Sequence, residues 1–268
     1  MSDLLFEKRN HIAHLTLNRP ERRNAFSCEM IVKLAAAWRE IRDDNELRVV
    51  MLTGSGSDAF CTGGDLRDFV PFLTGSKQPQ SEYEHSIVND MQQVLIALLR
   101  PFEFYKPIIA AVNGDAVAGG MELLQATDIR IAADHANFGL AEPQRGLVPG
   151  GGSMTRLARQ IGYAKAMEIL LTGDAIDAHE AWRIGFVNEV VSVDKVEERA
   201  HAFAERLAKN GPLAIRKIKE CVLRTSGVTI AEAFSIEDAI SAEVIVSKDA
   251  REGPRAFVEK REPKYTGT

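Results

Sequence analysis

The stretch that decides the fold is PIIAAVNGDAVAGGMELLQA, residues 107–126. Its first part, Pro107 to Asn113, is short, continuous and apolar, which is typical of a strand buried on both faces. The chain then passes through Gly114 into AGGMELLQA, which has the character of a helix. A buried strand that leads through glycines into a helix predicts an α/β fold with parallel strands.

The N-terminal part of the chain repeats this pattern. Residues Leu47 to Thr53 (LRVVMLT) predict a second buried strand, and the alternation of Ala13, Leu15 and Leu17 predicts a strand before it. Ser27 is placed to cap a helix between these two strands. Apolar residues at three- and four-residue steps give that helix its buried face. They are Met30, Ile31, Leu34, Ala35, Trp38 and Ile41.

The rest of the chain divides into a mixed part and a helical part. The segment GSGSDAFCTGGDL predicts a loop, and an exposed loop is expected around Thr74 to Glu84 between helical segments. Short strands are expected at 128–133, 136–139 and 186–191, and helices otherwise from Gly150 to about Glu259. We therefore predict an α/β core in residues 1–200 and a helical region in residues 201–268, without a linker between them.

Composition excludes several classes of protein. Hydrophobic residues make up 45% and charged residues 26% of the chain, as in soluble globular proteins. The 33 lysines and arginines against 38 acidic residues give a net charge of −5, which argues against binding to nucleic acid or an anionic membrane. The cysteines, Cys28, Cys61 and Cys221, lack metal-ligand spacing, so we expect free thiols, no metal site and a cytoplasmic location.

Two motifs resemble known sites but lack the context that such sites require. Gly54 to Ala59 matches the G-x-G-x-x-A form of a dinucleotide fingerprint, yet it continues into a loop rather than opening a helix. Ser153 lacks the second glycine of a nucleophile elbow and is instead expected to be a helix N-cap. No nucleotide cofactor is therefore expected.

Two glycine-rich turns each follow a buried strand and form the first part of a candidate site. They contain Gly63-Gly64 and Gly119-Gly120. Glycine allows a ligand to approach the backbone closely, and free N–H groups at a helix start favour an oxyanion. Two such donors would form an oxyanion hole for a carbonyl that gains negative charge. On spacing alone, plain strand-to-helix connections are the favoured interpretation of both turns.

Two carboxylates, Glu122 and Glu142, follow the second glycine turn and the strand expected at 136–139. A pair of acids beside an oxyanion hole can move protons at a carbon next to a carbonyl, one as base and one as acid. In the alternative interpretation, Glu122 stabilises the helix dipole and Glu142 is a solvated loop residue. The residues alone leave both interpretations open.

At these residues the sequence resembles the crotonase superfamily, also called the enoyl-CoA hydratase/isomerase family. The resemblance covers nearly the whole chain and implies a spiral of ββα turns, a helical C-terminal region that mediates trimers or hexamers, an acyl-CoA substrate and no separate cofactor. The matching segments, in order, are HLTLNRPERRNAFS, AFCTGGDL, KPIIAAVNGDAVAGGMELLQATDIRIA, ANFGLAEPQRGLVPGGGSMTRLARQIG, LTGDAIDAHEAWRIGFVNEVV and GPRAFVEKREP.

The resemblance also implies roles for the candidate residues. The amides of Gly64 and Gly119 would hold the thioester carbonyl, while Glu122 and Glu142 would be the two glutamates of a hydratase that adds water syn to a trans-2-enoyl-CoA. The presence of both glutamates favours a hydratase over a Δ3,Δ2-enoyl-CoA isomerase or another acyl-CoA lyase. RNA binding, known in some members, is disfavoured by the net charge. Fatty-acid metabolism is one of several pathways that use this scaffold.

Further residues match the family's CoA-binding and acyl-binding positions, although each is also compatible with an ordinary structural or solvated role. Lys260 matches a lysine that reaches the CoA of a neighbouring subunit. The segment Asp68 to Glu84 is longer than in short-chain hydratases and borders the acyl pocket in the family, so the acyl group stays open. The matched positions are Asn24, Ala25, Asp65, Leu66, Arg67, Phe257 and Lys260.

Overall fold

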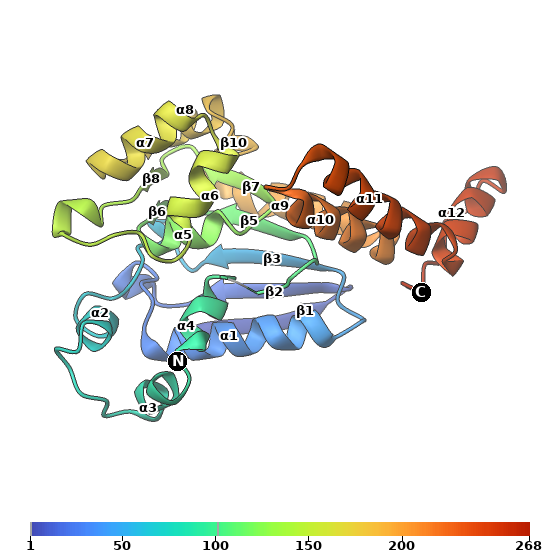
Figure 1. Cartoon of the computed structure of the whole chain (residues 1–268). Helices are drawn as coiled ribbons and strands as arrows, with labels where there is room; N and C mark the ends of the chain where they lie inside the picture. Colours follow the sequence, from blue (N-terminus) through green and yellow to red (C-terminus); the bar gives the residue numbers. More distant parts are fainter. Residues whose placement is uncertain (1, 101) are drawn as a thin grey trace.

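A computed structural model describes residues 2–100 and 102–268 (Figure 1). Within these residues the chain forms a six-stranded sheet in the order β1-β2-β3-β5-β7-β10 and a four-stranded sheet in the order β4-β6-β8-β9. The strands are β1 (Leu4–Arg9), β2 (Ile12–Leu17), β3 (Val49–Gly54), β4 (Ala59–Cys61), β5 (Ile108–Val112), β6 (Asp115–Val117), β7 (Ile129–Ala133), β8 (Asn137–Gly139), β9 (Ile176–Asp177) and β10 (Glu189–Val191).

Helices surround the two sheets and form the C-terminal part of the chain. Figure 1 shows α10 to α12 extending away from the sheets toward the C-terminus. The helices are α1 (Cys28–Asp43), α2 (Phe69–Leu73), α3 (Glu82–Asn89), α4 (Gln92–Ala97), α5 (Gly119–Leu124), α6 (Ser153–Gln160), α7 (Tyr163–Thr172), α8 (Ala178–Arg183), α9 (Val193–Ala208), α10 (Pro212–Thr225), α11 (Ile230–Ile245) and α12 (Lys248–Val258), with short 3-10 turns η1 (Pro20–Arg22) and η2 (Pro143–Arg145).

The chain moves repeatedly from the larger sheet to the smaller one, and this produces the spiral. β3, β5 and β7 lie in the larger sheet, and each is followed by a short strand, β4, β6 or β8, in the smaller sheet. The successive strands pair in parallel within each sheet, for example Val50 with Ile108 and Ala116 with Phe138. This arrangement confirms the predicted α/β spiral.

The core contains the segments that the apolar patterns predicted. Every residue of β5 is buried, as expected for a strand covered on both faces. Helix α1 buries Trp38, and the Ser27 side chain accepts a hydrogen bond from the amide of Met30 at 3.0 Å, which confirms the predicted cap. Helix α9 covers the larger sheet and packs against β3, β5 and β7.

Several local expectations differ from the structure. The segment expected to be a loop after Gly54 contains β4, which pairs with β6 through backbone hydrogen bonds that require no apolar periodicity. The strand expected over 186–191 is only β10, and β1 is an additional antiparallel strand. Glu84, expected in an exposed loop, is a buried residue of α3 because hydrogen bonds satisfy its carboxylate.

The expected division into residues 1–200 and 201–268 stays a prediction. Residue 200 itself lies inside α9, which packs on the larger sheet, so the helical arm seen in Figure 1 begins with α10. Among the described residues, no helix combines the length and the apolar character needed to cross a bilayer.

The first prediction concerns Gly120, where α5 lies against β4. A Cβ atom at Gly120 would lie 2.1 Å from the carbonyl oxygen of Cys61, a backbone atom that cannot move without displacing the strand. We expect Gly120→Ala to lower the free energy of unfolding by about 1–3 kcal/mol, measured by urea denaturation.

The matched control is Gly162→Ala at the start of α7, where a Cβ atom would meet no atom within 4 Å. It is expected to cause a smaller loss. Equal urea midpoints for Gly120→Ala and the wild-type protein would show that the close approach of α5 to β4 does not constrain the fold.

Candidate active site

A cavity of about 380 Å³ brings together the four residues at the centre of the predicted site. Gly64 lies in the turn after β4, Gly119 begins α5, Glu122 lies one turn further along α5, and Glu142 follows β8. The smaller sheet therefore positions all four, because β4, β6 and β8 lie side by side and each delivers its following segment to the same edge.

In the first glycine turn, the backbone N–H of Gly64 takes no part in the hydrogen bonds that join this turn to Phe26. The amide of Phe26 donates to the carbonyl of Gly63 at 2.8 Å, and the amide of Asp65 donates to the carbonyl of Phe26 at 3.0 Å. In this parallel bridge between Phe26 and Gly64, the N–H of Gly64 itself points to the opposite side. Gly119 is the first residue of α5, so its N–H has no acceptor within the helix.

The two glycine turns touch each other. Gly63 has a φ of +81°, and a Cβ atom there would lie 2.8 Å from the amide nitrogen of Gly119 and 2.8 Å from the Cβ atom of Ala118. Only glycine fits this conformation and this approach at residue 63. The contact brings the segments that carry the Gly64 and Gly119 amides to one wall of the cavity.

Ala118 has a backbone conformation that normally requires glycine. Its φ is 49° and its ψ is −130°, and it is the residue immediately before α5. For a residue with a side chain, such dihedral angles cost of order 1–3 kcal/mol. The strain lies next to the amide of Gly119 and is maintained by the surrounding packing, including the hydrogen bond from the Ala118 amide to the carbonyl of Gly139 at 2.8 Å.

Glu122 is a buried carboxylate held by backbone amides. Glu122 is only 4% exposed, and its Oε1 accepts a hydrogen bond from the amide of Ser153 at 3.2 Å. Burial raises the pKa of Glu122, while the amides of Ser153, Gly151 and Gly152 act in the opposite direction. Glu122 lies in the first turn of α5, as both interpretations of it require, but its burial beside the cavity is more than stabilisation of the helix dipole needs.

Glu142 is half-buried, and one of its carboxyl oxygens has no partner. Oε2 of Glu142 is buried without a hydrogen bond from any described residue. Burial and, to a lesser extent, the charge of Glu122 raise the pKa of Glu142 to about 7, while its own backbone amide and Arg145 act in the opposite direction. The interpretation as a solvated loop carboxylate is therefore wrong. The cavity therefore holds two carboxyl groups whose pKa values are both raised by burial, in different hydrogen-bonding surroundings.

The backbone amides of residues 151–153 that surround the carboxylate of Glu122 were not predicted from the sequence. A Cβ atom at Gly151 would lie 2.7 Å from Oε2 of Glu122, so glycine is needed there. Ser153 was expected to be an N-cap but is the first residue of α6, and Gly152 is the cap. The buried Oγ of Ser153 accepts a hydrogen bond from the Gln125 side chain at 2.7 Å. The run Gly150-Gly151-Gly152 was the available signal.

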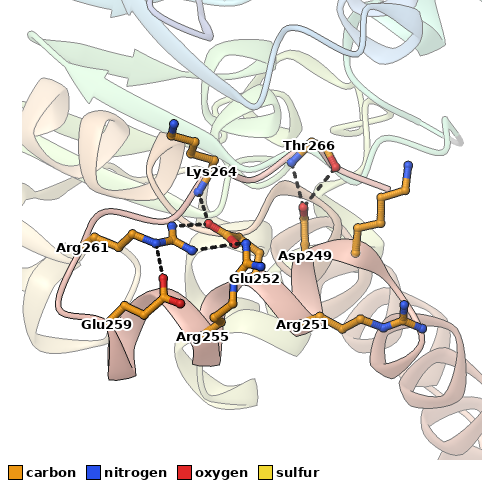
Figure 2. Close-up of a pocket in the computed structure, with 9 residues that line it drawn as sticks. Asp249, Arg251, Glu252, Arg255, Glu259, Arg261, Lys264 and Thr266 are labelled. Carbon is orange, nitrogen blue, oxygen red and sulfur yellow. Dashed lines mark hydrogen bonds and ion pairs between the residues drawn. The ribbon is translucent and has the colours of Figure 1, made fainter.

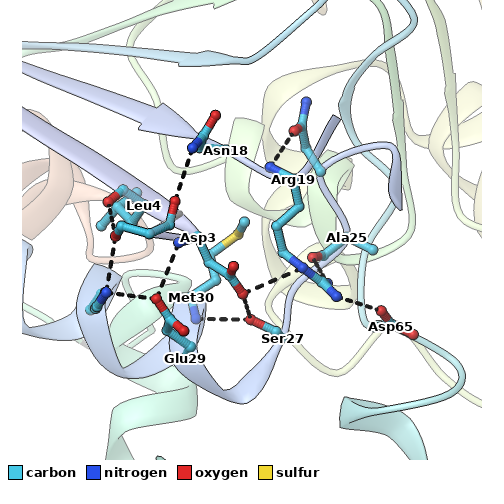
Figure 3. Close-up of polar contacts among 12 residues, drawn as sticks. Asp3, Leu4, Asn18, Arg19, Ala25, Ser27, Glu29, Met30 and Asp65 are labelled. Carbon is cyan, nitrogen blue, oxygen red and sulfur yellow. Dashed lines mark hydrogen bonds and ion pairs between the residues drawn. The ribbon is translucent and has the colours of Figure 1, made fainter. Parts of the chain in front are cut away.

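Three of the residues expected to bind CoA hold the backbone near the cavity. The Asn24 side chain is fully buried and donates to the carbonyls of Ser55 and Ala59 at 2.9 and 2.7 Å, so it cannot contact a ligand. Figure 3 shows Arg19 reaching both the carbonyl of Ala25, at 2.7 Å, and the carboxylate of Asp65, at 3.1 Å. Asp65 thereby fixes the turn that carries Gly64.

The remaining expected contacts lie at opposite ends of the molecule. Leu66 is 61% exposed and lines the cavity, and Arg67 is exposed beside it. Phe257, 85% exposed, belongs to α12 and Lys260 follows it, so within one chain neither lines this cavity. The expectation that Phe257 lines an acyl pocket stays a prediction, and because α12 lies at the end of the arm, that pocket would have to belong to another chain.

A larger cavity, of about 650 Å³, lies at α12 but contains none of the candidate residues. Figure 2 shows its carboxylates already engaged: Glu252 accepts hydrogen bonds from Arg261, Arg255 and Lys264, and Asp249 accepts one from Thr266 at 2.7 Å. These contacts attach the C-terminal segment to α12. They provide no acid or base for chemistry.

Comparison with known proteins identifies the class to which this fold and site belong. The family model for enoyl-CoA hydratase/isomerase matches residues 7–268. The chain is 41% identical to the enoyl-CoA hydratase EchA19 of Mycobacterium tuberculosis, over 98% of this chain and 96% of that protein. It is 35% identical to the (E)-benzylidenesuccinyl-CoA hydratase of Thauera aromatica, over 97% of this chain and 98% of that protein.

A solved structure gives the same result. The enoyl-CoA hydratase of Bacillus anthracis superimposes with a TM-score of 0.89 at 35% identity, covering 99% of this chain and 100% of that chain. The chain belongs to the enoyl-CoA hydratase/isomerase family, the crotonase superfamily, and is an enzyme with the crotonase fold.

The second prediction tests the strain at Ala118. Replacement of Ala118 by glycine removes the side chain that opposes the observed dihedral angles. The relief exceeds the entropic cost of glycine, of roughly 0.5–1 kcal/mol, so we expect Ala118→Gly to raise the free energy of unfolding by about 1 kcal/mol in urea denaturation.

Ala36→Gly is the matched control, because Ala36 is exposed in the middle of α1. Glycine at that position should lower the free energy of unfolding by about 1 kcal/mol. If both glycine variants lose stability equally, residue 118 is not strained.

Proposed function

We propose that the protein is an enoyl-CoA hydratase, which adds water to a trans-2-enoyl-CoA to form a 3-hydroxyacyl-CoA. The observation that supports this most directly is that Glu122 and Glu142 line one cavity, both largely removed from water and with raised pKa values. A hydration requires a base for the water and an acid for carbon, and two carboxyl groups in different surroundings can supply both.

In the proposed mechanism, the thioester oxygen accepts hydrogen bonds from the amides of Gly64 and Gly119. Ionised Glu122 removes a proton from water as its oxygen bonds to the β-carbon, and the electrons of the double bond move toward the thioester. Protonated Glu142 then donates its proton to the α-carbon, which completes the syn addition. Each amide donor is expected to stabilise the enolate-like transition state by about 3–4 kcal/mol, as in other oxyanion holes.

The same site supports a second candidate function, Δ3,Δ2-enoyl-CoA isomerisation, in which a single glutamate moves a proton between two carbons. The unpartnered Oε2 of Glu142 is the observation that favours it. The two candidates differ in their need for Glu122, since isomerisation uses no water as a reactant.

We also propose a homotrimer, or a hexamer formed from two trimers, in the cytoplasm. The arm exposes large apolar side chains that a monomer would leave in water. Lys260 and Phe257 lie outside the cavity of their own chain, so a contact with acyl-CoA requires the arm of another subunit. The proposed reaction needs no cofactor beyond the CoA of the substrate. The exposed apolar residues include Ile218, Val222, Leu223, Ile230, Phe234 and Val258.

The third prediction separates the two candidate functions. Glu122→Gln and Glu142→Gln should each lower the rate of hydration of crotonyl-CoA or a longer enoyl-CoA by about 10²–10⁴-fold, because each removes a proton-transfer group. The assay follows loss of the ultraviolet absorbance of the conjugated thioester. Glu262→Gln, in an exposed position outside the cavity, serves as the control with an unchanged rate.

Full hydration activity in both glutamate variants would rule out the proposed mechanism. Retained isomerisation of a 3-enoyl-CoA by Glu122→Gln, together with no hydration by the wild-type protein, would instead support the isomerase.

The fourth prediction is a bell-shaped dependence of kcat/KM on pH. Glu142 must be protonated to act as the acid, so kcat/KM should fall above its pKa of about 7. Glu122 must be ionised to act as the base, and because burial raises its pKa, kcat/KM should also fall in the acidic range. Initial rates at low substrate concentration over a pH series measure both limbs.

The Glu122→Gln variant provides an internal check on this assignment. It removes a negative charge that helps to raise the pKa of Glu142, so the alkaline limb of its residual activity should move to lower pH. An alkaline limb that does not move in Glu122→Gln, or that persists unchanged in the residual activity of Glu142→Gln, would show that Glu142 is not the acid.

A further inference from the structure

The cavity has an apolar wall beyond the two glutamates. Helix α2 contributes Phe69, Val70 and Leu73, and helix α4 with the residue that follows it contributes Val94, Leu95 and Leu98. At about 30 Å³ per heavy atom, the volume of a water molecule in the liquid, the heavy atoms of a four-carbon acyl group fill about two fifths of the 380 Å³ cavity. An acyl group of that size would leave much of this wall in contact with water.

The wall begins at the turn that carries Gly64. A Cβ atom at Gly64 would lie 3.1 Å from side-chain atoms of both Phe69 and Val70. The amides of Phe69 and Val70 each donate to the carbonyl of Asp65 at 2.9 Å. An acyl chain whose thioester lies at Gly64 would therefore meet α2 directly.

Helix α2 depends on an ionic connection to α3. It has only five residues, too few to be stable alone. Lys77, in the loop between the two helices, places Nζ 2.8 Å from Oδ1 of Asp68, directly before α2, and 2.5 Å from Oε1 of Glu84 in α3. We call these three residues the clasp. Figure 1 shows the loop that joins α2 to α3 at the edge of the molecule.

The clasp is anchored by a buried carboxylate. Glu84 is 3% exposed, and its Oε2 accepts hydrogen bonds from the amides of Gln80 and Ser81 at 2.6 and 2.8 Å. Burial alone would raise the pKa of Glu84, but the bonds from Lys77 and these amides lower it to about 2. Helix α3 in turn packs against α1, which belongs to the core. Lys77 thus connects the acyl-side wall to the core.

We propose that the enzyme prefers apolar acyl groups longer than four carbons, and that Lys77 is a positioning residue that holds the α2 wall against them. The proposal rests on the proposed function, because it takes acyl-CoA as the occupant of the cavity. Each methylene buried against the wall should strengthen binding about fourfold until the wall is covered.

The test measures binding and hydration separately. Calorimetry with the saturated butanoyl-CoA and octanoyl-CoA gives the ratio of their Kd values without chemistry. The wild-type protein should bind octanoyl-CoA at least fiftyfold more tightly. In Lys77→Met this ratio should fall at least tenfold while the Kd of butanoyl-CoA stays within about twofold. Lys77→Arg, which keeps the cation, should restore the ratio.

Lys8→Met is the matched control. Nζ of Lys8 also lies 2.8 Å from each of two carboxylates, those of Glu40 and Asp44, but Lys8 lies on β1, outside the cavity. The ratio of the two Kd values in Lys8→Met should equal that of the wild-type protein. Glu84→Gln, which keeps the size of the side chain, replaces Lys77→Met if circular dichroism shows that Lys77→Met is unfolded, and the same fall in the ratio is expected.

Three outcomes would overturn the proposal: equal binding of the two ligands by the wild-type protein, a parallel loss for both ligands in Lys77→Met, or an equal change of the ratio in Lys8→Met. Hydration of crotonyl-CoA and 2-octenoyl-CoA by the same preparations keeps the two proposals apart. Binding preference without hydration of either substrate would contradict the hydratase function but support the wall. Hydration of both substrates without a preference for length would support the hydratase function but contradict the proposed role of the wall.

Discussion

The contact between two backbone turns is the constraint on which the rest of this structure depends. Gly63 approaches the Ala118-Gly119 segment so closely that no side chain fits between them, and Gly120 approaches β4 even more closely. This contact sets the position of α5, and with it the Gly119 amide and Glu122. The strain at Ala118 is the cost of holding the turn in this conformation. The spiral makes the contact possible because it places the strands before both turns side by side in the smaller sheet.

Burial of the two carboxyl groups makes the cavity suitable for proton transfer. A buried carboxylate is unfavourable unless hydrogen bonds compensate it. Glu122 receives such bonds from the glycine-rich start of α6, whereas Oε2 of Glu142 receives none from the described residues. The two chemically identical groups therefore have different surroundings, and the same low polarity strengthens the interaction of a thioester oxygen with backbone amides. The proposed hydration uses both consequences of one apolar environment.

Helices and strands were predicted correctly where the apolar residues of the segment itself show a clear pattern of burial. β5 and α1 were predicted because continuous or periodic apolar residues report burial directly. β4 and β6 were not, because each is a three-residue strand next to glycines in a connection whose turn signals outweigh so short a run. Asn24 matched a ligand-binding position but is buried in a structural role, and Phe257 matched an acyl-pocket position but lies on a distant arm. Sequence position alone does not report which way a side chain points or which cavity it reaches.

The amino-acid sequence by itself determined an α/β fold, the two glycine turns and the pair of glutamates, since these depend on residue type and order along the chain, and its resemblance to a known family implied the spiral. Only the tertiary structure decided that Glu122 and Glu142 share one cavity, that their surroundings differ, and that Lys77 connects α2 to the core. The physical reason is that pKa values, burial and cavity shape arise from groups brought together from distant segments. The order of residues along the chain specifies which groups are present, but the distances between groups from distant segments are set only when the chain folds.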